Sequence, residues 1–475
     1  MMLRRGEYHA FSGADARYLY LVPSAAVIEI DDVSQAVLEA LTSGDRTAND
    51  LADSLSTRWS TDEVRVSIEE LVGVRAIQRV ATPIPAPTPP SVRAKRSIPL
   101  QTLVLNVTSK CNLSCGYCYE YGEDRIVESK TKPRFMDDAT ARQSVDFMFA
   151  EAEGSPAVNL TFFGGETLLN FKMLKSTLAY ARQRGEELGK QVNASLTTNA
   201  TLLREEIVDW FIENDVGVTV SIDGAREQQD KFRVFSNGMG SYDIILPRIK
   251  DLLARHTRRP VGARVTLTGQ NLDVASIYRH LFEEIGFWEV GFAPVTTSWQ
   301  REYAIEDEGF RSLLSGFQSL AADYLQAALA GRRHGFSNVR DTLEEIHKGM
   351  SKSHPCGAGF GLLGVATDGD VALCHRFAGS DSHKLGSVFS GVDHAAQATF
   401  LETHHIDNKT DCSTCWARPL CAGGCYHESF INHGQTAASN LNQCDRIRGW
   451  IDLCLRIYGQ IAVENPAFLE RFNEN

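Results

Sequence analysis

Residues 102–294 alternate short apolar runs of β type with longer runs whose apolar residues recur at helical spacing. The β-type runs are TLVLNVT (102–108), AVNLTFF (157–163), ASLTTN (194–199), VGVTVSID (216–223), GARVTLT (262–268) and WEVGFAP (288–294). The helical runs cover 137–153, 171–189, 204–214, 243–256 and 272–285. Strands that alternate with helices in this way predict an α/β fold with parallel strands and right-handed crossovers, as an open sheet or a partial barrel.

A different pattern precedes this region. YLYLVPSAAVIEI at 18–30 is of β type, and the stretches 34–43, 47–56 and 61–74 have helical spacing. Together they predict a small winged-helix-like module. The segment TPIPAPTPP at 82–90 alternates proline with small residues, which favours an extended spacer and marks a domain boundary.

The net charge of the chain limits the classes of molecule that it is expected to bind. The chain carries a net charge of -12, which argues against nucleic acid and anionic membranes as its main partners. Residues 1–80 hold eight Arg, no Lys and thirteen Asp plus Glu, whereas a DNA-binding winged helix should be basic. We expect instead that a strand edge in this module captures an extended peptide by β-augmentation. The N-terminus has no apolar export segment behind its two arginines, so we expect a cytoplasmic protein.

Unusual residues follow four of the predicted strands. Cys111, Cys115 and Cys118 come after the first strand with the spacing C-x3-C-x2-C. The second, third and fourth strands end at GGE (164–166), TTN (197–199) and SID (221–223). Each motif alone also occurs in ordinary turns. Because all four lie at the carboxyl ends of strands, where (β/α) barrels place their active sites, together they predict a functional site.

The cysteine motif suggests an iron-sulfur cluster. Eleven cysteines in a long chain without an export signal favour metal binding over disulfides. A four-iron cluster held by three thiolates keeps one iron open for a small chelating molecule. The motif C-x3-C-x-aromatic-C, with Tyr117 as the aromatic residue, followed by GGE resembles the signature of radical S-adenosylmethionine (SAM) enzymes. That resemblance implies a partial (β/α)6 barrel in which SAM binds the open iron and is cleaved to a 5′-deoxyadenosyl radical.

The same resemblance implies a set of cofactor contacts. The residues that would bind SAM are Tyr117, Gly164, Gly165, Glu166, Thr198, Asn199, Ser221, Asp223 and Arg233. The Glu166 carboxylate would suit the cationic amine of SAM. Arg233 would bind the SAM carboxylate bidentately, and the alternative is that it is only a solvated surface arginine.

Seven of the eight remaining cysteines form a second pattern nearer the C-terminus. CGAGFGLLGVATDGDVALC spans Cys356 to Cys374, and CSTCWARPLCAGGC begins at Cys412, with Cys444 beyond it. A zinc ribbon is the alternative for the second motif taken alone. The whole pattern resembles the SPASM extension of peptide-modifying radical SAM enzymes, which implies two auxiliary four-iron clusters. The distal cluster would be held by Cys412, Cys415, Cys421 and Cys444, and the nearer one by Cys356, Cys374 and Cys425.

Residues 357–373 contain no cysteine that could complete the nearer cluster. Its remaining iron would therefore be open, or bound by another group such as Asp370 or a substrate thiolate. His375, directly after Cys374, occupies the position where sulfatase maturases have an aspartate that acts as a base. His375 would act as the catalytic base, or only donate a hydrogen bond to a cluster sulfur. Cys454 lies in an apolar helical pattern and is expected to be a core thiol.

The total length, the PqqD-like N-terminal module and the motifs CNLSCGYCYEYGE (111–123), FFGGETLLNF (162–171) and LCHRF (373–377) most resemble, within this group, the maturation enzymes of quinohemoprotein amine dehydrogenase. The resemblance implies four regions: a PqqD-like recognition domain (1–81), a linker (82–98), a radical SAM core (99–340) and a SPASM domain (341–475). It implies thioether cross-links between Cys sulfur and Asp or Glu methylene carbon in the small γ subunit, with an electron leaving through an auxiliary cluster. An electron donor such as flavodoxin or ferredoxin is also implied. Alternatives are another peptide maturase, including the sulfatase formylglycine type, and a non-catalytic iron-sulfur or zinc peptide-binding protein.

Overall fold

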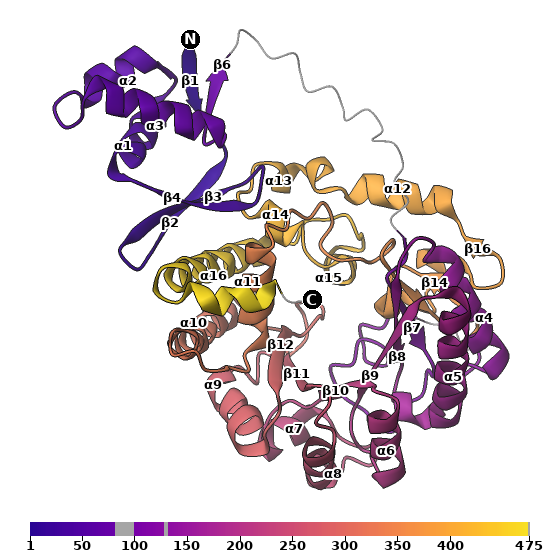
Figure 1. The fold of residues 1–475 in the computed structure, drawn as a ribbon. Helices are drawn as coiled ribbons and strands as arrows, with labels where there is room; N and C mark the ends of the chain where they lie inside the picture. The colour runs from indigo at the N-terminus through magenta and orange to yellow at the C-terminus, as the bar shows by residue number, and fades with distance from the viewer. Residues whose placement is uncertain (81–98, 128–131, 474–475) are drawn as a thin grey trace.

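A computed structural model describes residues 1–80, 99–127 and 132–473 (Figure 1). Among these residues the strands form three sheets: β5-β1-β6, β2-β3-β4, and a large sheet that runs from β12 to β16. The predicted linker at 82–98 lies outside the described residues.

Parallel strands form the main part of the large sheet, in the order β12-β11-β10-β9-β8-β7. They are β7 (Thr102–Asn106), β8 (Ala157–Phe163), β9 (Gln191–Thr198), β10 (Gly217–Ser221), β11 (Val261–Leu267) and β12 (Glu289–Pro294). Each corresponds to one of the predicted runs. The predicted α/β fold with parallel strands is confirmed.

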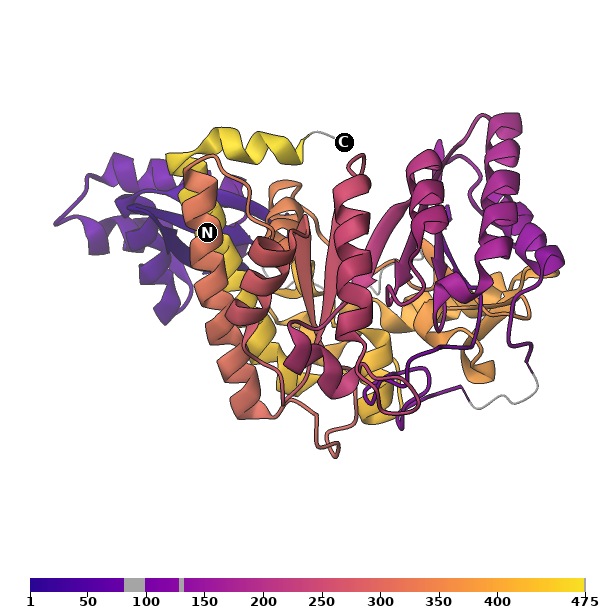
Figure 2. The ribbon, with the colours of Figure 1, turned by 90° about the horizontal axis from the view of Figure 1, so that it is seen from below.

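Helices surround the outside of the curved sheet (Figures 1 and 2). They are α4 (Asp138–Glu151), α5 (Phe171–Leu188), α6 (Glu205–Glu213), α7 (Arg226–Phe232), α8 (Tyr242–Arg255), α9 (Val274–Tyr278) with a π-helical continuation (Arg279–Ile285), α10 (Asp307–Leu329) and α11 (Ser337–His347). Local signals fix the ends of several of them. The Asp137 side chain accepts a hydrogen bond from the Thr140 N–H at the start of α4, and α5 ends at Gly189 in the left-handed conformation.

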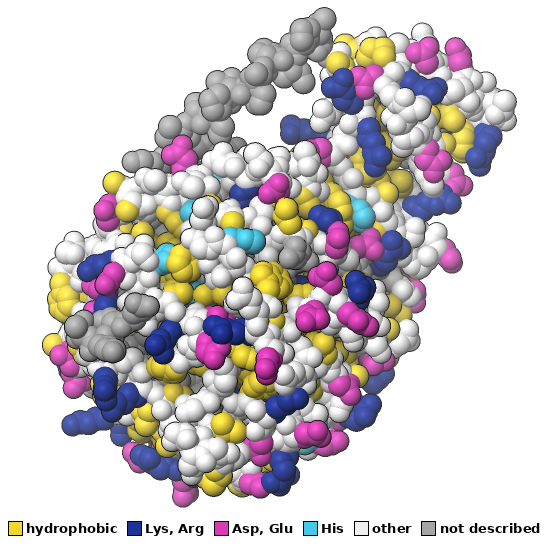
Figure 3. Space-filling view, turned by 180° about the vertical axis from the view of Figure 1, so that it is seen from behind, with side chains coloured by type: hydrophobic (Ala, Val, Ile, Leu, Met, Phe, Trp, Pro, Cys, Tyr) yellow, Lys and Arg dark blue, Asp and Glu magenta, His cyan; other side chains and the backbone are white. Residues whose placement is uncertain are grey.

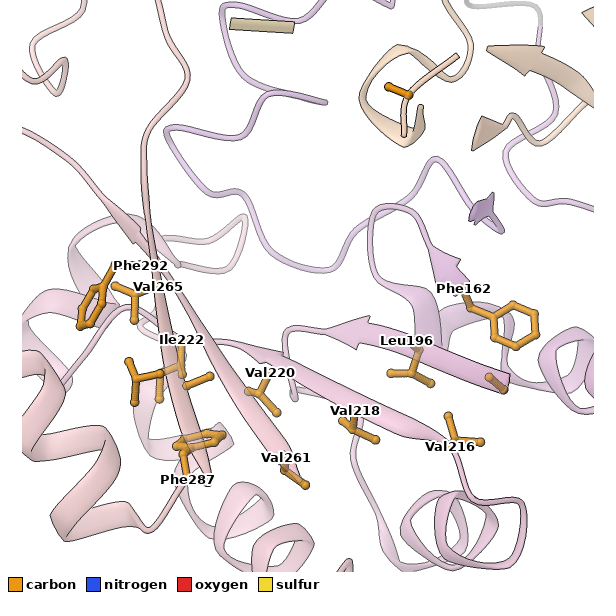
Figure 4. Close-up of a cluster of buried hydrophobic side chains, with 14 of the residues drawn as sticks. Phe162, Leu196, Val216, Val218, Val220, Ile222, Val261, Val265, Phe287 and Phe292 are labelled. Carbon is orange, nitrogen blue, oxygen red and sulfur yellow. The ribbon is translucent and has the colours of Figure 1, made fainter. Parts of the chain in front are cut away.

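Alternation along the strands separates the core from the site. In β10, Val218 and Val220 are buried beneath the helices together with Phe162, Leu196 and Val265 from neighbouring strands (Figure 4). Thr219 and Ser221 of the same strand line a cavity on the other face. Because successive side chains of a strand point to opposite faces, the same apolar run builds the core and presents polar groups to the cavity.

The C-terminal region extends the same sheet. β13 (Leu362–Val365) pairs in parallel with β7, and β14 (Asp370–Ala372), β15 (Lys384–Ser387) and β16 (Gly391–Val392) follow with antiparallel pairing. The helices here are α12 (His394–His404), α13 (Thr410–Ser413), α14 (Arg418–Cys421), α15 (Tyr426–His433) and α16 (Cys444–Glu464). The proposed domain limit at 340/341 falls inside α11, so the division between core and C-terminal domain stays a prediction.

The N-terminal unit contains the predicted strands and helices. Its elements are β1 (Met2–Arg5), β2 (Tyr8–Gly13), β3 (Ala16–Leu21), β4 (Ala26–Ile30), α1 (Asp32–Ala40), β5 (Arg46–Thr47), α2 (Ala48–Leu55), α3 (Thr61–Gly73) and β6 (Ile77–Val80). Leu19 and Leu21 face the helices of this unit, whereas Tyr18 and Tyr20 belong to the core of the main body. The two faces of β3 therefore join the unit to the rest of the chain.

This junction also has specific polar contacts. The His9 ring stacks on Trp416 with ring centroids 3.7 Å apart, and its Nε2 lies 2.6 Å from the Asp452 carboxylate. The Tyr18 hydroxyl donates to the carbonyl of Gly459 at 3.2 Å. The contacts with Asp452 and Gly459 dock β2 and β3 onto α16, and the stacking on Trp416 adds a contact outside this helix.

The face of the molecule in Figure 3 carries basic and acidic side chains side by side, including over the N-terminal unit. Such a mixed surface is not the basic footprint of a DNA-binding module. Among the described residues, none of the helices combines the length and the apolar character that crossing a membrane requires.

Candidate functional site

A cavity of about 1280 Å³ opens at the carboxyl ends of the parallel strands. It gathers most of the residues that the sequence motifs singled out. The predicted residues that line it are Cys111, Cys115, Cys118, Tyr117, Gly164, Gly165, Glu166, Thr198, Asn199, Ser221, Arg233 and His375. Asp223 is not among the lining residues, because its side chain is turned toward the residues that support the rim.

The loop with the first three cysteines is held by the last residue of α7 and the segment that follows it. The Ser114 N–H donates to the Val234 carbonyl at 2.7 Å, and the Gly116 N–H donates to the Phe232 carbonyl at 3.3 Å. Burial raises the pKa of the Cys111 thiol to about 12, and the negative charges of Glu166, Cys115 and Cys118 add to it. Burial raises the pKa of Cys115 to about 11, although Arg233 acts in the opposite direction. The thiols are thus close together in a site that needs positive charge to hold them as thiolates.

Glycines bring the GGE loop against the cysteine loop. A Cβ at Gly164, where φ is +139°, would stand 2.5 Å from the carbonyl oxygen of Thr108. A Cβ at Gly165 would stand 2.1 Å from the carbonyl oxygen of Lys110. The same loops are joined by hydrogen bonds from the Gly165 N–H to Thr108 and from the Glu166 N–H to Lys110. Only glycine allows this approach of two backbones.

The Glu166 carboxylate is buried and hydrogen-bonded within the protein. It accepts from the Thr198 hydroxyl at 2.7 Å, from the Asn199 N–H at 2.8 Å and from the Leu168 N–H at 3.1 Å. Burial raises its pKa despite these donors. The carboxylate therefore fixes the GGE loop to the end of β9, in addition to lining the cavity.

Asp223 anchors two residues of the cavity wall. Its carboxylate accepts from the Tyr117 hydroxyl, pairs with Arg233 Nε at 3.0 Å and accepts from the Thr266 N–H at 3.0 Å. The Arg233 side chain is 10% exposed, so the alternative of a solvated surface arginine is wrong. Burial works against its charge, but Asp223 and the other anionic groups nearby raise the pKa of Arg233 overall. A permanent positive charge thus lies beside Cys115.

His375 lines the cavity next to Phe163, with ring centroids 4.6 Å apart. Burial, helped by the charge of Arg376, lowers the pKa of His375 to about 3. The imidazole is therefore neutral near pH 7 and a weak base in this environment, which suits a hydrogen-bonding role. Its role as the catalytic base stays a prediction.

The C-terminal cysteines form two neighbouring groups. Cys356, Cys374 and Cys425 interact electrostatically with one another, and burial together with this interaction raises the pKa of Cys374 to about 12. The second group lines a small cavity of about 50 Å³, which Cys425 also reaches. Its members are Cys412, Cys415, Cys421 and Cys444. The assignment of these cysteines to two clusters, which the SPASM resemblance implies, stays a prediction.

The possible metal ligands in all three groups are cysteine thiols. Within the described ranges, no three His, Cys, Asp or Glu side chains are close enough to hold one metal ion. The first group lines the large cavity and the third group lines the small one. Cysteine thiolates are the usual ligands of four-iron clusters, and the auxiliary clusters stay a prediction. Around the nearer group, the Tyr426 hydroxyl and both ring nitrogens of His427 are buried without a partner among the described residues.

Asp370 and Cys454 have other surroundings. The Asp370 carboxylate is held by Lys132 Nζ at 2.8 Å and by Lys384 Nζ at 2.6 Å. It is already neutralised by two lysines, which argues against its suggested role as a cluster ligand. Cys454 is fully buried in α16, as expected for a core thiol.

The motifs did not reveal several cavity residues. Tyr119 lies beside His375 and interacts electrostatically with both Cys118 and Cys374, so it stands between the first and second cysteine groups. Arg264 and Arg376 also line the cavity. The sequence did contain a hint that Arg264 faces the cavity, because it is the charged residue inside the apolar run GARVTLT. A charge at that position of a strand must face away from the core.

Known proteins share both sequence and fold with this chain. Residues 105–281 match the family model of the radical SAM superfamily. The serine-type anaerobic sulfatase-maturating enzyme of Bacteroides thetaiotaomicron is 30% identical over 232 residues, which are 48% of this chain and 53% of that enzyme. The chain therefore spans about half the length of this relative. The cysteine-type enzyme of Clostridium novyi is 26% identical over 362 residues, covering 72% of this chain and 92% of the relative.

Solved structures show the same architecture. The structure described as native anSMEcpe with bound AdoMet has a TM-score of 0.65 at 20% identity and covers 79% of this chain and 100% of its own. Streptococcus suis SuiB bound to the precursor peptide SuiA has a TM-score of 0.50 at 13% identity, with 92% of this chain and 98% of SuiB covered. Residues 105–281 thus match the radical SAM family model, and the chain has the radical SAM α/β fold of these structures.

Proposed function

We propose that this chain is a radical SAM peptide maturase that forms thioether cross-links in the small γ subunit of quinohemoprotein amine dehydrogenase. Each cross-link would join a Cys sulfur to a methylene carbon of Asp or Glu. The proposal specifies, within the radical SAM family, the substrate and the bond formed. SAM and three four-iron clusters would be its cofactors.

One observation carries the proposal: each group of cysteines has a neighbour in the next. The first group lines the large cavity, and Tyr119 interacts electrostatically with Cys118 of this group and with Cys374 of the second. The third group adjoins the second at Cys425. A radical generated at the first group and an electron-accepting site beside it are what an oxidative bond-forming reaction needs.

The nearer auxiliary site has room for a substrate thiol. It has three cysteines, and Cys356 and Cys425 are exposed. Asp370 is occupied by lysines, so it leaves the fourth position to another group. A thiol bound to iron is deprotonated, which would prepare a substrate cysteine for carbon–sulfur bond formation.

When bound, SAM and the cluster on the first three cysteines would supply the radical that removes a hydrogen atom from the substrate methylene. The chain's own residues provide the setting. The buried Glu166 carboxylate ties the GGE loop to β9, and Asp223 holds Arg233 in the wall, where its charge would meet the SAM carboxylate. For each cross-link the polypeptide loses one hydrogen atom from carbon, one proton from sulfur and one electron.

The N-terminal unit offers a place for a precursor segment. In the sheet β2-β3-β4 the strand β2 lies against α16, where a Cβ at Gly13 would stand 2.8 Å from the Arg456 carbonyl oxygen. Among the described residues, no strand pairs with the outer edge of β4 (Ala26–Ile30). An extended peptide could add there as a further antiparallel strand. The neighbour SuiB is described as bound to its precursor peptide, which supports a similar use here.

A second candidate is sulfatase maturation, because the Clostridium novyi enzyme is matched over 92% of its length. Structures of anSMEcpe are also described with the peptides Cp18Cys and Kp18Cys. His375 at the position of the expected aspartate argues against this assignment.

Mass spectrometry separates the two candidates. The purified, reconstituted protein is incubated without oxygen with SAM, a one-electron reductant and either the γ-subunit polypeptide or a sulfatase peptide. We expect the γ-subunit polypeptide to lose a pair of hydrogens per cross-link, with its cysteines no longer open to alkylation. Formylglycine in the sulfatase peptide, with an unchanged γ subunit, would favour the second candidate and refute the first.

A further inference from the structure

The charged groups that line the large cavity are mostly paired. The lining cations among the described residues are Lys110, Arg233, Arg264 and Arg376, and the lining acids are Glu120, Glu166, Glu289 and Asp341. Arg233 pairs with Asp223, and Arg340 pairs with both Glu289 and Asp341. Glu166 is satisfied by hydrogen bonds from β9 and its own loop. Lys110 is exposed and lies over the Phe135 ring.

Arg264 has no acidic partner of its own within the part of the chain that the structure describes. It lies on β11 between Ser221 of β10 and Gly291 of β12, and its side chain enters the cavity. Among the described residues, no side chain forms a hydrogen bond or ion pair with its guanidinium. The absence of a side chain at Gly291 makes room for it, since a Cβ there would stand 3.2 Å from Arg264 Nη1.

A second arginine faces the same space. Burial lowers the pKa of Arg264, and the positive charge of Arg376 lowers it further, while Asp341 acts in the opposite direction. Asp341 is held by Arg340, with its Oδ1 2.7 Å from Arg340 Nη2. Two guanidinium groups thus line one cavity, and an anion bound between them would relieve their mutual repulsion.

The partners of Arg376 leave its charge available. Its Nη1 donates to the Thr296 hydroxyl at 3.0 Å, and its guanidinium lies 4.9 Å from the centre of the Tyr119 ring. Both partners are neutral. The Glu428 carboxylate also interacts electrostatically with Arg376. Its interaction with Arg446 is stronger, and it accepts a hydrogen bond from Gln443.

Glu120 does not serve as the missing counter-ion. It lines the cavity wall beside the first cysteine group. Its electrostatic neighbours are Cys118, Tyr119 and Tyr121, not the two arginines.

We propose that Arg264 and Arg376 bind a carboxylate of the substrate polypeptide, the side chain of an Asp or Glu residue. This inference rests on the proposed function in that it takes the substrate to be a polypeptide. Guanidinium groups bind carboxylates bidentately, and binding would hold the adjacent methylene groups within the cavity that the first cysteine group lines. The carboxylate of SAM is the alternative ligand for these two arginines. The experiment below distinguishes binding of SAM from binding of the substrate side chain.

Chemical modification of the cluster-reconstituted protein tests the site without relying on turnover. Phenylglyoxal modifies accessible arginines, and mass spectrometry of peptides gives the rate at each one. The probes are acetyl-Ala-Asp-Ala-amide, the same peptide with Asn in place of Asp, and SAM alone. Arg258, exposed before the start of β11, is the control.

We expect the Asp peptide to slow modification of Arg264 and Arg376 severalfold, the Asn peptide to have little effect, and Arg258 to react alike throughout. Equal protection by the Asp and Asn peptides, or none, would overturn the proposal. Protection by SAM alone that the Asp peptide does not reproduce would assign the arginines to SAM and also overturn it.

A binding measurement with variants gives a second, independent test. The γ-subunit polypeptide is compared with a version whose acidic residues at the cross-linked positions are Asn or Gln. For the wild-type protein we expect about tenfold tighter binding of the acidic version, as one charged hydrogen-bonded contact provides. Arg264→Gln should lose this preference, Arg264→Lys should keep part of it, and Arg258→Gln should keep all of it. A preference unchanged in Arg264→Gln would contradict the proposal.

The two proposals fail in different ways. If cross-links form but neither arginine responds to the change from Asp to Asn, the carboxylate site is wrong and the maturase proposal stands. If the Asp peptide protects Arg264 but the γ subunit is never cross-linked, the carboxylate site stands and the thioether activity is wrong.

Discussion

The ion pair between Asp223 and Arg233 should be the most sensitive polar contact in the cavity wall. The two side chains are 1% and 10% exposed, and Nε lies 3.0 Å from Oδ2. Asp223→Asn keeps the shape of the side chain but leaves a buried guanidinium without its counter-ion. Breaking such a pair costs about 3 to 5 kcal/mol. Since a unit of this size unfolds with an entropy of about 0.8 to 1 kcal/mol/K, the melting temperature should fall by about 3 to 6 °C.

A double-mutant cycle gives the sharper test. Arg233→Met should destabilise the protein by a similar amount, because it leaves the buried Asp223 carboxylate without its counter-ion. The double variant should then lose clearly less than the sum of the two single changes. The assay is thermal unfolding of anaerobic protein at one scan rate, followed by circular dichroism. Asp243→Asn is the control, since its pair with Arg226 is exposed and should be replaceable without effect. Strict additivity of Asp223→Asn and Arg233→Met would refute the reasoning.

Three further outcomes are expected. Cys115→Ala should abolish SAM cleavage while the iron of the auxiliary groups stays bound, as iron analysis and detection of 5′-deoxyadenosine would show; complete loss of iron would contradict separate sites. Deletion of residues 1–80 should weaken binding of the full-length precursor more than SAM cleavage, and equal loss of both would count against peptide capture by the N-terminal unit. His334 stacks on Tyr278, and burial lowers its pKa to about 4, so the stability it contributes is complete above pH 6.5 and declines as the pH falls toward 4. His334→Gln should flatten the dependence of melting temperature on pH in that window; an unchanged profile would show that another group controls it.

The parts of the fold predictable from sequence were those with a local signal. Each parallel strand has its own apolar run, and each site motif follows the end of a strand, so the topology brings the motifs together at one edge. The helices of the N-terminal unit also have local signals. Ser60 and Glu63, for example, form a capping box at the start of α3.

What the sequence did not reveal depends on contacts between distant segments. The stacking of His9 on Trp416 and the pairing of β13 with β7 join regions hundreds of residues apart. The turn of Asp223 away from the cavity follows from its bonds to Tyr117 and Arg233, which no local pattern encodes. The division of the later cysteines into two groups came from the resemblance to the SPASM extension and not from spacing alone.

Isotope transfer tests the central claim most directly. The γ-subunit polypeptide is prepared with deuterium on the methylene carbons of its Asp and Glu residues and incubated without oxygen with the reconstituted protein, SAM and a one-electron reductant. We expect deuterium in 5′-deoxyadenosine, matched by cross-links in the polypeptide. Release of 5′-deoxyadenosine without deuterium, together with an unmodified polypeptide, would contradict the thioether activity proposed for this chain.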